Sequence, residues 1–237
     1  MIKHLPDLLA DSTVLESDII CLQETWVHGN YVPEIPGYTV YFDGVGKGKG
    51  VATFIRNHLV ERQKLRLVEQ FGNEDHVQGL KLYFNDVHII NVYRPPNPTS
   101  NKHLEQLMQT LREKIDPEQQ TVICGDLNFN FLREPRHKIV IMLDQLGFQQ
   151  IVRQPTTIHG SCLDQVYLRG KLLFKYKLHY PYYSDHECVC VMLKKELEIE
   201  SLKKEFAQER QMNMMMMAPF MPPLHGTPSM PPPQAIP

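Results

Sequence analysis

Short apolar runs separated by polar turns occupy the first 193 residues of the chain. Seven of these runs are rich in valine, isoleucine and aromatic residues, a composition that is typical of β-strands. They cover residues 19–24, 51–55, 78–84, 87–93, 121–126, 163–168 and 188–193. Asn85 and Asp86 lie alone between two of the runs, which predicts a tight hairpin turn at that point.

Three other segments carry apolar residues at helical spacing. The clearest set recurs at i, i+3, i+4, i+7 and i+11: Leu104, Leu107, Met108, Leu111 and Ile115. A second helix is predicted around 136–146 and ends at Gly147, because glycine readily adopts the left-handed conformation that follows a helix. A third helix, with Pro6 near its start, precedes the first strand. Strands mixed with helices in this way predict an α/β or α+β sandwich.

The composition of the chain changes after residue 193. Residues 194–211 are highly charged and rich in helix formers, and their few apolar positions form no clean stripe, so we expect a solvated or partner-seeking helix. Residues 212–237 are rich in methionine and proline and cannot build a core, which predicts a disordered tail. The sequence therefore predicts one domain over 1–193, followed by a charged helix and a disordered tail, with a protein partner for the helix and tail as the less favoured alternative.

Composition limits the class of protein. Apolar residues make up 42% of the chain and the formal net charge is −2, which is ordinary for a soluble protein and gives no basic surplus of the kind common in nucleic-acid binders. The five cysteines are odd in number and form no C-x-x-C pair, which favours reduced thiols. No secretory signal or membrane-spanning stretch is visible, so we expect an intracellular protein, nuclear or cytoplasmic.

Polar residues at the ends of the predicted strands carry the chemistry. Four separate strands deliver at least one carboxylate each, and two of them add an amide or an imidazole: Glu24, Asp126 with Asn128, Asp164, and Asp185 with His186. Side chains at strand ends are exposed in a rigid setting and can converge on a ligand. Carboxylates without thiolate partners suit a hard cation, so the sequence predicts a Mg²⁺ or Mn²⁺ site.

Each of these blocks has a simpler structural interpretation. Gly-Asp-Leu-Asn is often a turn in which Asp and Asn bond the backbone, and Ser-Asp-His before a strand is often a loop with one satisfied histidine. Gln-Glu-Thr reads as a polar strand end, and Leu-Asp-Gln as a capped turn. For any single block the structural interpretation is the better one, whereas all four at strand ends in this order favour a catalytic site.

In these blocks the chain resembles the endonuclease/exonuclease/phosphatase superfamily, which includes proteins similar to deoxyribonuclease I and to the apurinic endonucleases. The resemblance covers the first 193 residues and is strongest to the endonucleases of mobile elements, retrotransposons or Helitron-associated. The segments typical of those enzymes are SDIICLQETW, GKGVATFI, NVYRPPN and QPTTIHGSCLDQVYL. The resemblance implies a four-layer sandwich, in which helices flank two packed mixed β-sheets, and a DNA substrate.

The resemblance also implies a role for each site residue. Glu24 would bind the catalytic Mg²⁺ directly, and Asp185 would lie near the same ion. Asp126 and Asn128 would hold and activate the attacking water, with Asp126 the better candidate for general base. His186 would donate a hydrogen bond to the scissile phosphate, and Asp164 would orient its ring. Tyr93 would contact the phosphate or support the leaving group.

One expected part of the family pattern is missing from the sequence. Family members begin with a strand that ends in an Asn of the metal site, placed before a helix such as the one that starts at Met1. A truncated gene model, a decayed mobile-element copy or a protein that has dropped catalysis would each account for this. The intact remaining blocks favour the first two explanations.

Four functions are therefore weighed. The favoured one is a metal-dependent DNA endonuclease that hydrolyses a phosphodiester by in-line attack of water. The second is a phosphatase or phosphodiesterase acting on a small compound, and the third is an inactive interaction module. The fourth, an unrelated carboxylate-rich binding protein, fits the ordered blocks poorly. Inositol-phosphate phosphatases of the superfamily usually carry Cys-Asp-Arg where this chain has Leu163, Asp164 and Gln165, which argues against that branch.

Overall fold

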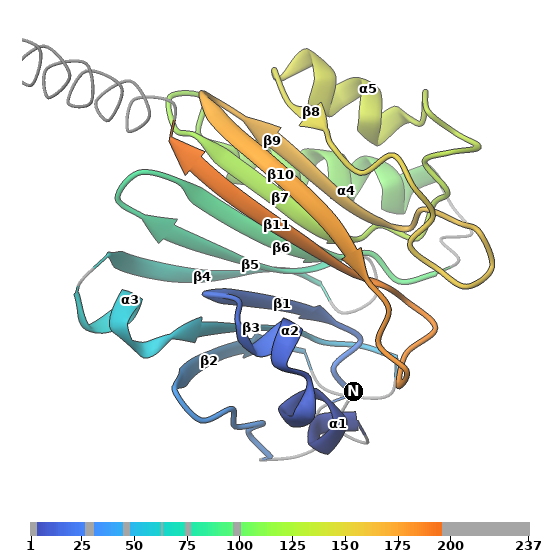
Figure 1. The fold of residues 1–237 in the computed structure, drawn as a ribbon. Helices are drawn as coiled ribbons and strands as arrows, with labels where there is room; N and C mark the ends of the chain where they lie inside the picture. Colours follow the sequence, from blue (N-terminus) through green and yellow to red (C-terminus); the bar gives the residue numbers. More distant parts are fainter. Residues whose placement is uncertain are drawn as a thin grey trace, which may run out of the picture. The chain divides into compact units, whose positions relative to one another are not determined.

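The computed structural model of the chain describes residues 4–26, 31–44, 48–62, 64–73, 77–96 and 101–195. These residues form eleven strands and five helices (Figure 1). The strands divide into a six-stranded, a three-stranded and a two-stranded sheet.

The six-stranded sheet is the centre of the molecule. Its strands, in sheet order, are β4 (Leu65–Asn73), β5 (Val77–Phe84), β6 (His88–Tyr93), β7 (Thr121–Asp126), β9 (Asp164–Arg169) and β8 (Gln149–Gln150). The β6–β7 pair is parallel and every other pair is antiparallel, so the sheet is mixed.

The two smaller sheets are antiparallel. One contains β1 (Ile19–Gln23), β3 (Val51–Arg56) and β2 (Tyr38–Asp43) in that order, and the other is the hairpin of β10 (Leu172–His179) and β11 (Cys188–Lys195). Strands β1, β2 and β3 contact the six-stranded sheet through β5, β6 and β7. Apolar residues of the hairpin pack against the core that surrounds the six-stranded sheet.

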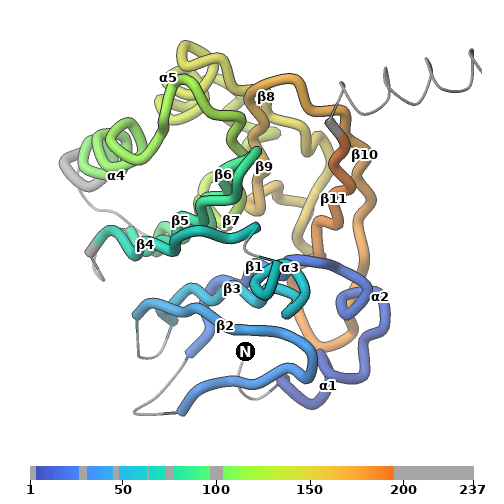
Figure 2. The backbone as a smooth tube through the Cα atoms, turned by 90° about the vertical axis from the view of Figure 1, so that its left-hand side faces the viewer, coloured from blue at the N-terminus to red at the C-terminus, as the bar shows by residue number. Residues whose placement is uncertain are grey.

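Helices cover the outer faces of the stacked sheets (Figure 2). Helices α4 (Asn101–Lys114) and α5 (Lys138–Gln145) bury their apolar stripes in the core of the six-stranded sheet. Helices α1 (Leu5–Ala10) and α2 (Ser12–Leu15) bury theirs against β1 and β3 on the other side. Helix α3 (Asn57–Glu61) follows β3 and has no buried residue. Burial of a leucine side chain in such a core stabilises the fold by about 2 kcal/mol.

The layered sandwich, all seven predicted strands and the three predicted helices are confirmed. The predicted turn at Asn85 and Asp86 also joins β5 to β6. Two details differ, since hydrogen bonding divides the strands into three sheets rather than two, and β2, β4, β8 and β10 were not predicted. Strands β4 and β10 mix apolar with polar residues and are largely half-buried or exposed, so neither contains a long apolar run.

Two positions in the fold have backbone conformations that favour glycine. Gly147 has φ 80° and follows α5, as the helix-capping prediction expected. Gly125 has φ 148°, and a Cβ atom there would lie 1.7 Å from the carbonyl oxygen of Val92. Only glycine therefore allows β7 to approach β6 so closely, one residue before Asp126.

The predicted C-terminal elements are mostly outside the described residues. Strand β11 continues through Lys195, two residues beyond the predicted end of the domain, and 196–237 lie outside the described part of the chain. No helix in the described residues is long and apolar enough to cross a membrane.

Candidate functional site

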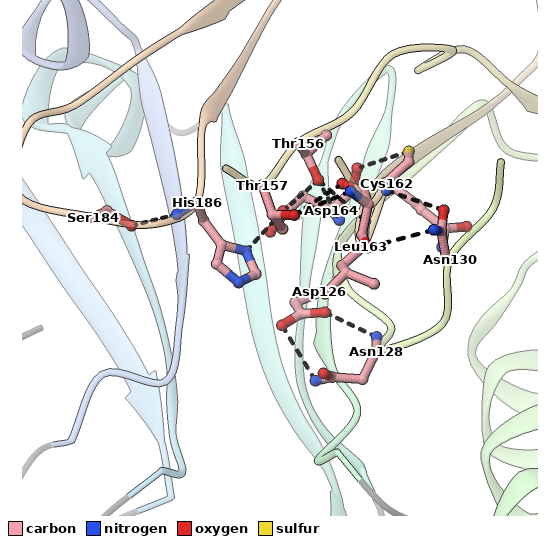
Figure 3. A network of polar contacts seen from close by, with 12 residues as sticks. Asp126, Asn128, Asn130, Thr156, Thr157, Cys162, Leu163, Asp164, Ser184 and His186 are labelled. Carbon is pink, nitrogen blue, oxygen red and sulfur yellow. Dashed lines mark hydrogen bonds and ion pairs between the residues drawn. The ribbon is translucent and has the colours of Figure 1, made fainter. Parts of the chain in front are cut away.

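Two strand ends bring the first pair of predicted site residues together. Asp126 is the last residue of β7, Asp164 is the first residue of β9, and the two face each other in the antiparallel register. Figure 3 shows both carboxylates turned toward the same region. Like charges directly opposite on neighbouring strands destabilise a sheet, so this pairing costs free energy.

His186 forms an ion pair with one of these carboxylates. Its Nδ1 lies 2.8 Å from Oδ2 of Asp164, and this contact raises the pKa of His186 to about 9, so the imidazole is protonated at neutral pH (Figure 3). The hydroxyl of Thr156 donates to the same Oδ2 at 2.7 Å and accepts the backbone N–H of Asp164. Asp164 is thus fixed from two sides and holds His186 in one orientation.

Asp126 has the most perturbed carboxyl group of the site. It is only 5% exposed, and burial raises its pKa to about 7, with a further contribution from the negative charge of Asp164. The backbone N–H of Asn128 and the charge of His186 act in the opposite direction, and Glu24 adds to the rise. A carboxyl group with a pKa near neutrality can both accept and release a proton under physiological conditions.

Asn128 holds Asp126 in place. Its backbone N–H donates to Oδ1 of Asp126 at 2.8 Å and its side-chain amide to Oδ2 at 3.2 Å (Figure 3). It has φ 49°, an uncommon conformation for a non-glycine residue. The Asn128 amide also donates to the carbonyl of Arg94, whose buried guanidinium donates to the carbonyl of Leu127 at 2.9 Å.

Glu24 and Tyr93 form the second part of the site. The hydroxyl of fully buried Tyr93, at the end of β6, donates to Oε1 of Glu24 at 2.7 Å. The indole N–H of Trp26 reaches Oε2 at 3.4 Å. Glu24 and Trp26 have φ 48° and 54°, and residues in such conformations cluster at functional sites. Burial, then the hydrogen bond to Glu24, raises the pKa of Tyr93, which keeps this phenol protonated.

Asp185 is the one predicted residue whose side chain stays exposed. Its carbonyl accepts the N–H of Ile158 at 3.0 Å, and the next residue, His186, forms an isolated β-bridge with Thr157. The backbone of this loop is therefore fixed against the 156–161 turn. The negative charge of Asp185 contributes to the raised pKa of His186.

The carboxylates of the site fit a divalent cation. One ligand atom each of Asp126, Asp164 and His186 lie within 4.8 Å of one another, the one such group in the described residues. His186 donates to Asp164 as an imidazolium and is therefore a poor ligand, whereas carboxylate oxygens are what hard cations prefer. Burial raises the pKa of Asp126, and the negative charges of Asp164 and Glu24 add to the rise, so a nearby cation would favour its ionised form. Neither Glu24 nor Asp185 belongs to the 4.8 Å group.

The model of the Endonuclease/Exonuclease/phosphatase family matches residues 2–186. The chain belongs to this family. The match runs from α1 through His186 and thus includes every predicted site residue.

Solved structures of family members share the fold. An AP endonuclease from Archaeoglobus fulgidus superposes with a TM-score of 0.59 at 20% identity, over 81% of this chain and 94% of that one. The endonuclease domain of TRAS1, a telomere-specific non-LTR retrotransposon, gives 0.57 at 16% identity over 80% and 90%. A 3′-5′ exonuclease from Neisseria meningitidis gives 0.59 at 17% identity over 81% and 94%.

A curated sequence relative matches part of the chain. Recombination repair protein 1 of Drosophila melanogaster is 30% identical over an alignment of 131 residues, and the match covers 49% of this chain. The match covers 19% of that protein, so this family member spans about a fifth of its relative's length.

Two residues of this family member's site were not singled out from the sequence. Thr156 binds Asp164, and Arg94 ties the backbone after β7 to the end of β6. Both lie in segments that carry the family resemblance, QPTTIHGSCLDQVYL and NVYRPPN. Their partners are 8 and 33 residues away in sequence, so spacing alone gave no signal for the contacts.

Proposed function

We propose that this chain is a divalent-cation-dependent DNA endonuclease of the mobile-element type, which hydrolyses phosphodiester bonds by in-line attack of water. The observation that carries the proposal is the pairing of a proton acceptor with a proton donor. Asp126 has a pKa of about 7, and it lies beside an imidazolium that Asp164 holds in place. Phosphoryl transfer needs both groups, together with neutralisation of the phosphate charge.

Each side chain has a defined task in this proposal. Asp126 accepts a proton from the attacking water, while Asn128 keeps both of its oxygens oriented. His186 donates from its free Nε2 to a phosphate oxygen, because its Nδ1 is occupied by Asp164. Tyr93 orients Glu24 through its hydroxyl.

Glu24 is the proposed direct ligand of Mg²⁺ or Mn²⁺, with Asp185 near the same ion. When bound, the cation would neutralise charge on the phosphate as bond breaking proceeds. Trp26 and Tyr93 leave the Glu24 carboxylate in a fixed orientation, which a ligand oxygen requires.

Apolar and aromatic side chains near the site support a large substrate. Ile158, Tyr180 and Tyr182 are 69%, 71% and 81% exposed; the tyrosines lie on the same loop as His186, and Ile158 follows Thr157, which forms a β-bridge with His186. Exposed aromatic rings can stack on nucleotide bases, a contact that a DNA substrate would use. Two of the solved structures that share this fold are endonucleases and one is an exonuclease, which supports this choice.

Nicking of supercoiled plasmid in Mg²⁺ tests the proposal. We expect wild type to nick, chelation by EDTA to stop it, and Asp126→Asn to lower the rate by roughly 10³-fold. His186→Gln should lower it by roughly 10²-fold, since it removes the cationic donor. Asp144→Asn is the matched control, because Asp144 is an exposed carboxylate on α5, and its rate should stay within about twofold of wild type.

Two small substrates separate the alternatives. A diester and a monoester of nitrophenyl phosphate report phosphodiesterase and phosphatase activity. Release from the monoester without plasmid nicking would replace the endonuclease with a phosphatase. Equal nicking by Asp126→Asn and wild type would overturn the site assignment, and no turnover by wild type on any substrate would favour the interaction-module reading.

A further inference from the structure

A single hairpin loop carries two of the proposed site residues. Strands β10 and β11 pair up to His179 and Cys188, so the connection between them, residues 180–187, closes the hairpin. We call this segment the site loop, because it contains Asp185 and His186. On one side it is fixed by the 156–161 turn, where the N–H of Glu187 donates to the carbonyl of Thr156 at 2.8 Å.

On the opposite side, two carboxylates from the start of the chain contact the site loop and its base: Asp7 through an exposed bond to Tyr182, and Asp11 through more buried bonds. Oδ2 of Asp11 lies 2.7 Å from Nε2 of His179 and accepts the hydroxyl of Tyr183 at 3.0 Å. These partners are the residue at the base of the hairpin and one in the middle of the loop. The Asp11 side chain is only 10% exposed, so water competes little for these bonds.

Asp11 also has an ordinary structural role. Its other oxygen, Oδ1, accepts the N–H of Val14 at 3.2 Å and so caps the N-terminus of α2. A cap needs only one short acceptor, which Ser supplies as well as Asp. The two loop contacts therefore go beyond what the helix requires. Apolar packing also links the site loop to the N-terminal helices, since Tyr183 and Cys188 pack against the cluster that contains Leu5 and Leu8 of α1.

We propose that Asp11, through His179 and Tyr183, is a positioning residue that fixes the site loop and so sets where His186 lies relative to Asp126. The catalytic consequence rests on the proposed function, whereas the positioning itself does not. Asp11 touches no substrate in this scheme. It acts across the loop from Asp164, so that His186 is held between the 156–161 turn and the N-terminal helices.

Amide hydrogen exchange tests the positioning without any turnover. The reporters are the amides of Ser184, His186 and Glu187, which bond within the loop or to the 156–161 turn. In Asp11→Ser we expect these amides to exchange about tenfold faster than in wild type, because the loop opens more often. The Val14 amide should be unchanged, because Ser keeps the helix cap.

Two further variants make the test specific. Tyr183→Phe removes only the hydroxyl and should raise loop exchange about threefold. Asp7→Ser is the matched control, the same change in α1, because the bond of Asp7 to Tyr182 is exposed and should matter little. Loop exchange equal to wild type in Asp11→Ser, or a rise confined to Val14, overturns the inference.

Steady-state kinetics then tests the catalytic consequence. Asp11→Ser should lower kcat for plasmid nicking about tenfold and change KM less than about twofold, since the reacting groups are misplaced while the binding surface remains. His179→Gln keeps a donor N–H and should retain more activity than His179→Ala. Faster loop exchange with unchanged kcat would overturn the effect on catalysis. If wild type does not turn over at all, the proposed function fails while the exchange result still decides the positioning.

Discussion

At the His88 end of β6, a partly buried polar cluster has its charges matched by partners from the chain itself. Glu69 accepts from Lys114 at 2.5 Å and from Tyr83 at 2.6 Å. The amine of Lys81, which is only 4% exposed, donates to the last carbonyl of α4 and lies 4.2 Å from the centre of the Tyr83 ring. The hydrogen bond from Lys114 lowers the pKa of Glu69, the sign of a satisfied carboxylate.

At the Tyr93 end of the same strand, the charges do not balance. Burial raises the pKa of Asp126 to about 7, the negative charges of Asp164 and Glu24 add to the rise, and the imidazolium of His186 opposes it. The ionised carboxylate of Glu69 is stabilised by its partners, whereas ionised Asp126 is destabilised by burial and by the neighbouring carboxylates. Burial of charge therefore indicates a function only where the chain leaves the charge unmatched.

The largest expected effect comes from separating the strands at the site end. In Gly125→Ala the new methyl group would collide with the carbonyl of Val92, so the free energy of unfolding should fall by about 3 kcal/mol or more. Gly147→Ala is the control, because its nearest contact would be 3.7 Å away and only the cost of a left-handed alanine, about 1 kcal/mol, applies. Thermal unfolding followed by circular dichroism measures both, and equal losses would contradict the close approach.

Removing the unmatched charge should stabilise the protein. Asp126→Asn keeps the size of the side chain and abolishes the cost of ionising a buried carboxyl whose pKa is about 7. We expect the free energy of unfolding at pH 8 in EDTA to rise by on the order of 2 kcal/mol, while nicking is lost. A lower stability of Asp126→Asn at pH 8 would show that the charge is matched after all.

A carboxyl-to-amide substitution at the His88 end of β6 should lower the free energy of unfolding instead of raising it. Glu69→Gln removes the charge that faces Lys114, and we expect a loss of about 1 kcal/mol, discounted because a third of the Glu69 side chain is exposed to water. Glu113→Gln on α4 is the control, since its bond to Gln109 is exposed and its loss should be barely measurable. Urea unfolding at pH 7 distinguishes them, and a gain in Glu69→Gln would remove the contrast between the two ends.

The pH dependence of stability should sharpen the comparison with smaller effects. The pKa of Glu69 is lowered in the folded state, so its contribution is present above pH 4.5 and lost as the pH falls further. The pKa of His186 is raised from 6.5 to about 9, so its contribution is full below pH 6.5 and lost as the pH rises through 9.

The pKa of Asp126 is raised from 3.8 to about 7 in the folded state, so its ionisation lowers the free energy of unfolding as the pH rises from 3.8 to 7. Melting temperatures of the metal-free protein should therefore decline from pH 6.5 to 9, and His186→Gln should flatten that decline without changing the acid limb. Parallel curves for wild type and His186→Gln would contradict the ion pair with Asp164.

Strand ends were the part of the site that the sequence could predict. The runs that end at Asp126 and begin at Asp164 are continuous and apolar, so their ends are sharp in the sequence as well as in the fold. The alignment of these two residues as register partners is not a local property. It depends on the pairing of β7 with β9, which no spacing in the sequence encodes.

Contacts between segments distant in the sequence could not be predicted, for the same reason. Asp11 and His179 are 168 residues apart, and each looks like an ordinary surface residue when read alone. Strand β10, which ends at His179, is half-buried and contains two lysines, so it lacks the long apolar run that marks the predicted strands. The contacts of Asp11 that hold the site loop therefore follow from the three-dimensional fold and not from any local sequence pattern.

That separation has a consequence for when the site forms. Helices α1 and α2 have six and four residues, too few to be stable before they pack. Asp11, between them, contacts His179 in a hairpin near the end of the described chain, so this contact can form only after the hairpin has formed. Contacts of such long range form late in folding. We expect pulse-labelled amides of β6 and β7 to be protected before those of the site loop. The hydrophobic core would then form before the candidate site is complete.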